Sequence, residues 1–144
     1  MLAQLEECAY LDLTGISEPG RNSLRLVVEE LQVGFQPAAQ KIEHTESCRV
    51  FEIKWKTYIA YAVLNESYAH VKEDEVYEGR LVRVYAKSNF LEHIRRETFA
   101  DERRPGPFTH VALVCMHHIV HVVSASSQQV RLAKPGQPRR VPAA

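Results

Sequence analysis

The sequence predicts an α+β fold: a curved, mainly antiparallel β-sheet of about six or seven strands, with one main helix at about residues 89–99 packed on it. Three stretches support this prediction. Residues 48–70, CRVFEIKWKTYIAYAVLNESYAH, have the pattern of a central strand pair, and residues 88–99 have helical spacing. Residues 108–124 form a long run rich in β-branched side chains, which favours strands.

The first third of the chain is less regular. Residues 1–13 fit either a short helix or a strand, and residues 16–22 contain Pro19-Gly20 and predict a loop. Between residues 23 and 33 the apolar alternation changes phase after Val28. One extra residue in a strand produces such a change, so we expect a β-bulge in this strand. The polar residues 41–47 fit a loop or a weak edge strand.

In the central stretch, Phe51, Ile53 and Trp55 alternate with polar residues that include Glu52, so one face is expected to be buried and the other wet. Residues 58–64 are apolar or aromatic on both faces, which predicts a strand inside the sheet. The boundary at residues 56–57 fits either a tight turn or a bulge within one long strand.

A further strand is predicted at residues 80–86, with Val82, Val84 and Ala86 facing inward. The helix is expected to start at Ser88 or Asn89, and Asn89 as its N-cap places Glu92 at the spacing of a capping box. Apolar positions recur along one helical face, and Glu92 with Arg96 forms a favourable pair four residues apart. The helix must end before Pro105-Gly106-Pro107.

Residues 108–124 are too long for one ordinary strand, so we expect two strands, or one bent strand, with a break near residues 116–118. A closing strand is predicted at 130–133. Residues 1–133 are thus expected to form a single globular domain. The remainder, 134–144 (KPGQPRRVPAA), is basic and Pro-rich and is predicted to be a disordered tail.

Composition limits the function classes. The 144 residues include 18 basic and 18 acidic side chains, which argues against a nucleic-acid or anionic-membrane binder. No apolar run approaches the roughly 20 residues of a membrane helix. Three separated cysteines without a CxxC motif favour a reducing compartment, so we expect a cytoplasmic protein.

The histidines of residues 110–121 are the candidate metal ligands: His110, His117, His118 and His121. On a strand, positions four apart lie about 13 Å from each other and cannot share one metal ion. A site would therefore need a ligand from elsewhere in the chain. No cofactor is predicted from this stretch alone, and a divalent metal held by these histidines with a carboxylate is the alternative.

Asn65, Glu66 and Tyr68 are the candidate ligand-binding residues. They directly follow the most apolar strand and offer an amide, a carboxylate and a phenol to a small polar ligand. The competing interpretation is a turn capped by polar side chains. Glu52-Ile53-Lys54 also matches half of a metal-dependent nuclease core, for which Asp12 is the available upstream acid, and equally matches any solvated strand face.

Five segments together resemble a family of small uncharacterised bacterial proteins: YIAYAVLNESYA (58–69), GRLVRVYAKSNFLEHI (79–94), TFA (98–100), PGPFTH (105–110) and HIVHVVS (118–124). The resemblance covers about half of the chain and implies no activity. Similar sequences are expected to carry an acidic residue where this chain has His121, which weakens a metal site built on that histidine.

We therefore expect a small cytoplasmic binding or interaction module, such as an inhibitor or immunity-type partner of another protein. Its partner is expected to be a protein or a second copy of the chain. The segment 65–78, with five acidic residues and one lysine, suits a basic partner surface. The alternatives are a metal-dependent hydrolase that uses the histidines and a domain that binds a small polar ligand.

Overall fold

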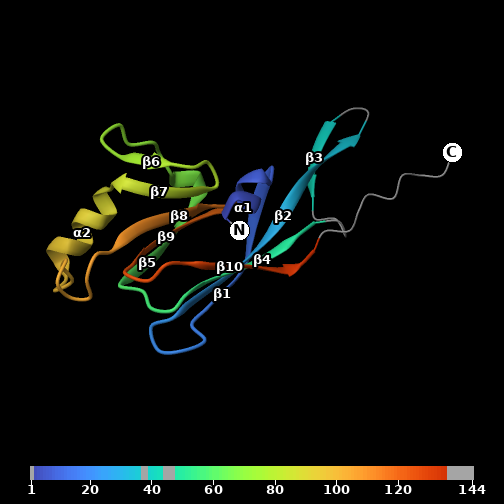
Figure 1. Cartoon of the computed structure of the whole chain (residues 1–144). Helices are drawn as coiled ribbons and strands as arrows, with labels where there is room; N and C mark the ends of the chain where they lie inside the picture. Colours follow the sequence, from blue (N-terminus) through green and yellow to red (C-terminus); the bar gives the residue numbers. More distant parts are fainter. Residues whose placement is uncertain (1, 37–38, 44–47, 136–144) are drawn as a thin grey trace.

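A computed structural model describes residues 2–36, 39–43 and 48–135 and divides the strands between two antiparallel sheets (Figure 1). The first sheet has the order β1-β2-β4-β10, and β3 pairs with the far end of β2 as a projecting hairpin. Its strands are β1 (Tyr10–Ser17), β2 (Leu24–Gln36), β3 (Ala39–Glu43), β4 (Val50–Trp55) and β10 (Gln129–Lys134).

The second sheet has the order β5-β9-β8-β7-β6. Its strands are β5 (Ala60–Asn65), β6 (Val76–Glu78), β7 (Val82–Lys87), β8 (Thr109–Val114) and β9 (His118–Ser124). Two α-helices, α1 (Leu2–Glu7) and α2 (Asn89–Glu97), and one 3-10 turn, η1 (Glu66–Tyr68), complete the described elements. The predicted α+β class and main helix are confirmed, whereas the single curved sheet is wrong.

The main core lies between the two sheets. Alternate residues of β8 and β9, such as Val111 and Val122, join one apolar cluster with Leu26 of β2 and Phe51 of β4. Leu5 of α1 belongs to the same cluster and is fully buried. Alternation along β4 is confirmed, since Phe51, Ile53 and Trp55 are all in this core.

The outer face of the second sheet carries the other set of alternate residues. Leu91 and Ile94 of α2 pack there on Phe108 and Val123, as the helical stripe predicted. The N-cap is Ser88 rather than Asn89, because the Ser88 hydroxyl accepts a hydrogen bond from the N–H of Leu91. Glu92 pairs with Arg95 and not with Arg96.

The strand predicted to lie inside a sheet is instead an edge. β5 pairs with β9 alone among the described strands, and Val63 is 45% exposed. The chain at 56–59 is neither a tight turn nor a bulge; it leaves β4 of the first sheet and enters β5 of the second. Apolarity on both faces therefore did not indicate a central position in this chain.

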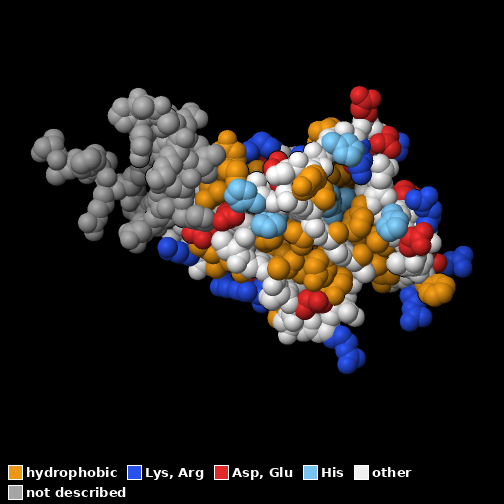
Figure 2. Space-filling view, turned by 180° about the vertical axis from the view of Figure 1, so that it is seen from behind, with side chains coloured by type: hydrophobic (Ala, Val, Ile, Leu, Met, Phe, Trp, Pro, Cys, Tyr) orange, Lys and Arg blue, Asp and Glu red, His pale blue; other side chains and the backbone are white. Residues whose placement is uncertain are grey.

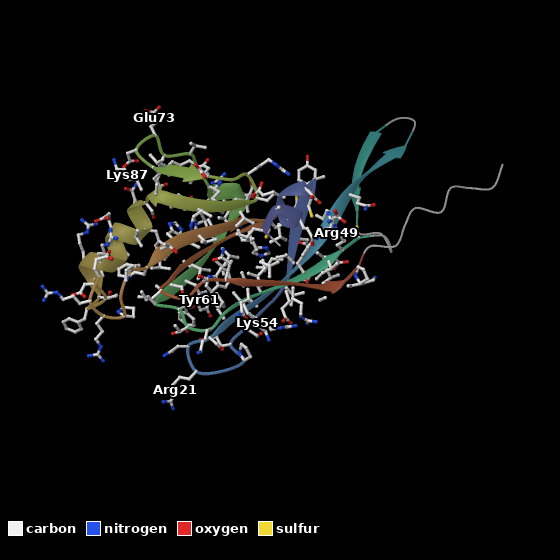
Figure 3. The ribbon with its side chains drawn as sticks, viewed as in Figure 1. Arg21, Arg49, Lys54, Tyr61, Glu73 and Lys87 are labelled. Carbon is white, nitrogen blue, oxygen red and sulfur yellow. The ribbon has the colours of Figure 1, made fainter. Side chains whose placement is uncertain are left out.

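The predicted bulge lies in the neighbouring strand. Pairing of β1 with β2 shifts between Leu13 and Gly15, whereas β2 and β4 pair without a shift. The phase change in β2 has another cause: Glu30 is buried and is held by Arg49, with 2.9 Å between Oε2 and Nη2. Figure 3 labels Arg49 beside α1.

Strand β7 also departs from its predicted facing. Val82 is buried as expected, but Val84 is 43% exposed, and Tyr85 on the opposite face is buried. The later strands agree with the sequence, because β8 and β9 are separated by a turn at 115–117 and β10 closes the first sheet. Most of the tail predicted to be disordered, residues 136–144, lies outside the described residues.

Candidate functional site

A pocket of about 420 Å³ lies between the outer face of the second sheet and the segment 66–77, which crosses over it. Strands β5, β7, β8 and β9 form the floor with Leu64, Arg83, Tyr85, Val114, Ile119 and His121. The crossing segment forms the wall with Glu66, Tyr68, Ala69, His70, Val71, Lys72, Glu75 and Tyr77. Figure 2, seen from the side opposite to Figure 1, shows histidine side chains around a hydrophobic area of the surface.

Local hydrogen bonds explain how the wall is held over the sheet. At the end of β5, Asn65 accepts a hydrogen bond from the N–H of Ser67, 3.0 Å away, and starts the turn η1. The N–H of Glu66 also donates to the carbonyl of His117 in the β8–β9 turn. At the other end, the carboxylate of Glu75 accepts from the backbone N–H of Asn89, 3.0 Å away, at the start of α2. The wall is therefore anchored at both ends.

Two of the three predicted ligand-binding residues line this pocket. Glu66 and Tyr68 belong to the wall, and Tyr68 is 79% exposed. Asn65 is not a lining residue, because its side chain caps η1, as the turn interpretation expected. Of the three predicted residues, two therefore lie at the edge of the pocket, and Asn65 caps the adjacent turn.

The four candidate metal ligands do not converge. His110 and His121 lie on neighbouring strands with 2.9 Å between Nε2 and Nδ1, while His117 and His118 lie in and directly after the β8–β9 turn. Among the residues that the structure describes, no group of three or more histidine, cysteine or acidic side chains is placed to hold a metal ion.

His110 and His121 instead belong to a buried chain of polar groups. The Ser88 hydroxyl lies 2.5 Å from Nδ1 of His110, whose ring stacks on Tyr85 with 4.1 Å between centroids. Ser88 and His110 are almost fully buried. Burial and the neighbouring His121 lower the pKa of His110 to about 3, and burial lowers the pKa of His121 as well. Both rings are therefore neutral at pH 7.

The direction of the hydrogen bonds follows from what Ser88 already binds. Its oxygen accepts from the N–H of Leu91, and among the described atoms the acceptor for its proton is Nδ1 of His110. His110 then carries its own proton on Nε2 and donates it to Nδ1 of His121. We infer that His121 carries its proton on Nε2, as a donor at the pocket floor.

Arg83 supplies a second donor. Its guanidinium lies over the ring of Tyr77, 4.6 Å from the centroid. Its Nε atom is buried without a hydrogen-bond partner among the described residues. Buried donors are rarely left unpaired in proteins, so the hydrogen bonding of this pocket-lining residue is incomplete among the described residues. Arg83 also borders a neighbouring hollow of about 290 Å³.

Glu52 has a different role from the one its motif suggested. It was expected on a wet face, but it is 5% exposed. Its carboxylate pairs with Arg25 at 2.7 Å, Arg131 at 3.3 Å and Lys54 at 3.5 Å. Hydrogen bonds from Arg25 and Arg131 lower its pKa to about 2. These ion pairs engage the Glu52 carboxylate and link strands β2, β4 and β10 of the first sheet.

Sequence reasoning missed Arg83, Tyr85 and Ser88. Arg83 and Tyr85 stand two apart on one strand, which places them on one face, but that face was assigned to the exterior. His110 and His121 meet because Ala112 pairs with His121 in the β8–β9 register. A register of this kind requires the strand pairing, which residue spacing alone does not provide.

Comparison with protein-family models, curated proteins and solved structures gives no match to this chain. The resemblance to small uncharacterised bacterial proteins therefore stays a prediction. Within the described part of the chain, no helix has the length and apolar character that a membrane crossing requires.

Proposed function

We propose that this protein binds a small ligand that has an anionic oxygen head group and an apolar or planar body. The observation that carries the proposal is that two donors line one pocket: the Nε of Arg83, which is buried without a partner among the described residues, and the Nε2–H inferred for His121. A carboxylate or phosphate has two or more acceptor oxygens, so it can accept a hydrogen bond from each of these donors.

The lining holds two basic and two acidic side chains, so the anion site depends on the placement of the basic groups and not on net charge. Glu75 is the acidic group of the wall nearest to α2, and its carboxylate already accepts a hydrogen bond from the helix start. Lys72 and Arg83 contribute positive charge to the lining. Glu66 belongs to the same wall and suits a hydroxyl or amine donor elsewhere on the ligand.

The remaining lining favours a planar or apolar body. Tyr77 and Tyr85 present aromatic side chains, and Leu64, Val114 and Ile119 add aliphatic ones. A volume of about 420 Å³ is within the range of small-molecule sites. Such sites combine an apolar lining with a few well-placed polar groups.

Ligand binding fits the described residues better than the two other expected functions. For the metal-dependent hydrolase, the described residues include no group of three or more histidine, cysteine or acidic side chains that could hold a metal ion. In the acidic segment expected to meet a partner, Asp74 and Glu75 both contact Asn89. Glu73 lies at the outer end of this loop and stays available to a partner (Figure 3).

A calorimetric titration tests the proposal with matched probes. Benzoate and phenyl phosphate are expected to bind, whereas benzamide, which has the same ring without the charge, is expected to bind at least about tenfold more weakly. Arg83→Gln should abolish the difference between benzoate and benzamide. Arg21→Gln is the control, because Arg21 lies on a loop far from the pocket (Figure 3). Equal binding of both probes, or no binding of any anion, would contradict the proposal.

A further inference from the structure

Strand β5 exposes a backbone edge that no described strand covers. It pairs with β9 over six consecutive residue pairs without a register shift. The N–H of Glu66 donates to His117, which sets the alternation along the strand. The N–H and C=O groups of Tyr61, Val63 and Asn65 are consequently directed away from β9, toward the free edge.

Three other described edge strands, β6, β1 and β10, carry features that discourage pairing. β6 has three residues and a register shift against β7, and β1 has a bulge against β2. β10 has a shift at its end and carries Arg131 and Lys134. Bulges, charges and short length are the usual ways in which proteins protect an edge strand. β5 has none of them, and both Val63 and Leu64 are exposed.

The side chains of β5 indicate which partner fits. Residues 58–65, YIAYAVLN, contain no charged residue and no proline. A two-fold antiparallel pair sets each residue of a strand opposite a residue of its own copy, so any charge near the axis would face an identical charge. A neutral, apolar strand is self-complementary in this arrangement, whereas a charged partner would find no opposite charge on it.

We propose that two copies of this chain associate through β5, antiparallel and centred on Val63, to form one continuous sheet. In this register Val63 lies opposite Val63 of the second copy, and Tyr61 lies opposite Asn65. Each of these pairs exchanges backbone hydrogen bonds through the groups that now point to solvent. β5 then becomes an interior strand, which agrees with its apolar character on both faces.

Analytical ultracentrifugation over a concentration series tests the association. The wild type is expected to be a dimer, and Val63→Lys should raise the dimer dissociation constant at least about tenfold. Val84→Lys is the matched control: Val84 faces the same side of the same sheet and is similarly exposed, but β7 has neighbours on both sides. It should leave the dimer unchanged. A monomeric wild type, or a dimer that Val63→Lys does not weaken, overturns the proposal.

Amide hydrogen exchange provides a test that needs no variant. In the proposed dimer the amides of Val63 and Asn65 exchange slowly, and their protection increases with protein concentration. A dimer in which these two amides exchange as fast as those of a loop must use another surface, and that result also overturns the proposal. Both experiments are made without ligand, so their outcome does not depend on whether the pocket binds one.

Discussion

Nε2 of His110 lies 2.9 Å from Nδ1 of His121, and this contact links the helix α2 to the pocket. Ser88 caps α2 and holds the first ring, the first ring holds the second, and the second ring lines the pocket. One serine therefore serves two purposes: it accepts a hydrogen bond at the helix start, and through His110 it sets the position of the proton on His121.

The tautomers of these histidines form the first prediction. Both rings are expected to be neutral at pH 7, with the proton on Nε2 in each. Long-range ¹H–¹⁵N correlation spectra distinguish the two tautomers directly. Ser88→Ala should remove the preference at His110, because its Nδ1 loses the donor.

Ser127→Ala, which changes an exposed serine of the β9–β10 turn, should leave both tautomers as they are. A proton on Nδ1 of either ring in the wild type would contradict the inferred direction of the chain.

The buried histidines also predict how stability depends on pH. The folded pKa of His110 is about 3, well below the 6.5 of an unperturbed histidine, so on acidification the unfolded chain takes up this proton before the folded one does. The stabilisation is complete above pH 6.5 and decreases as the pH falls from 6.5 toward 3. The free energy of unfolding should fall by about 1.4 kcal/mol per pH unit for such a histidine.

Urea unfolding between pH 7 and pH 5.5 measures this slope. His110→Gln should make it shallower, whereas His93→Gln, which changes an exposed residue of α2, should preserve it. If His110→Gln and the wild type show the same slope, His110 has the same pKa in the folded and unfolded states and the account of its burial is wrong.

Glu52 gives a prediction with a different pH window. Its folded pKa of about 2 lies below that of an unfolded glutamate, so its stabilisation is present above about pH 4.5 and is lost as the pH falls toward 2. Glu52→Gln should lower the free energy of unfolding by about 1–3 kcal/mol at pH 7, because hydrogen bonds to a charged group are lost. The difference from the wild type should shrink near pH 2.

Glu73→Gln, at the outer end of the acidic loop, should change stability little at either pH. A Glu52→Gln variant as stable as the wild type at pH 7 would show that its ion pairs with Arg25 and Arg131 contribute no net stability.

Much of the fold could be predicted from the sequence where one local signal dominates. The stripe of α2, the alternation of Phe51, Ile53 and Trp55, and the break between β8 and β9 all follow from periodicity and turn residues. Errors arose where tertiary contacts decide. Glu30 and Glu52 are buried and pair with arginines that are distant in sequence: Arg49, directly before β4, and Arg25 on β2. No local pattern shows such partners.

Of the residues that line the pocket, the sequence could predict only those at the end of β5. Glu66 and Tyr68 follow a strand directly, which marked them as residues on a rigid support. Arg83 and His121 lie on strands that are distant in sequence and meet through sheet order and register. His117 lies in the β8–β9 turn, whereas His121 contacts His110 on the neighbouring strand, a pairing that spacing along one strand does not reveal.

The central claim is that Arg83 and His121 bind the anionic head group of a small ligand. Titrating ¹⁵N-labelled protein with benzoate or phenyl phosphate, to about 10 mM, tests it most directly. The Arg83 Nε–H and His121 Nε2–H resonances are expected to shift together along one binding curve in the wild type, and Arg83→Gln should remove the shift at His121. Both resonances staying unchanged at saturating anion, or shifts confined to residues outside the pocket, would contradict the claim.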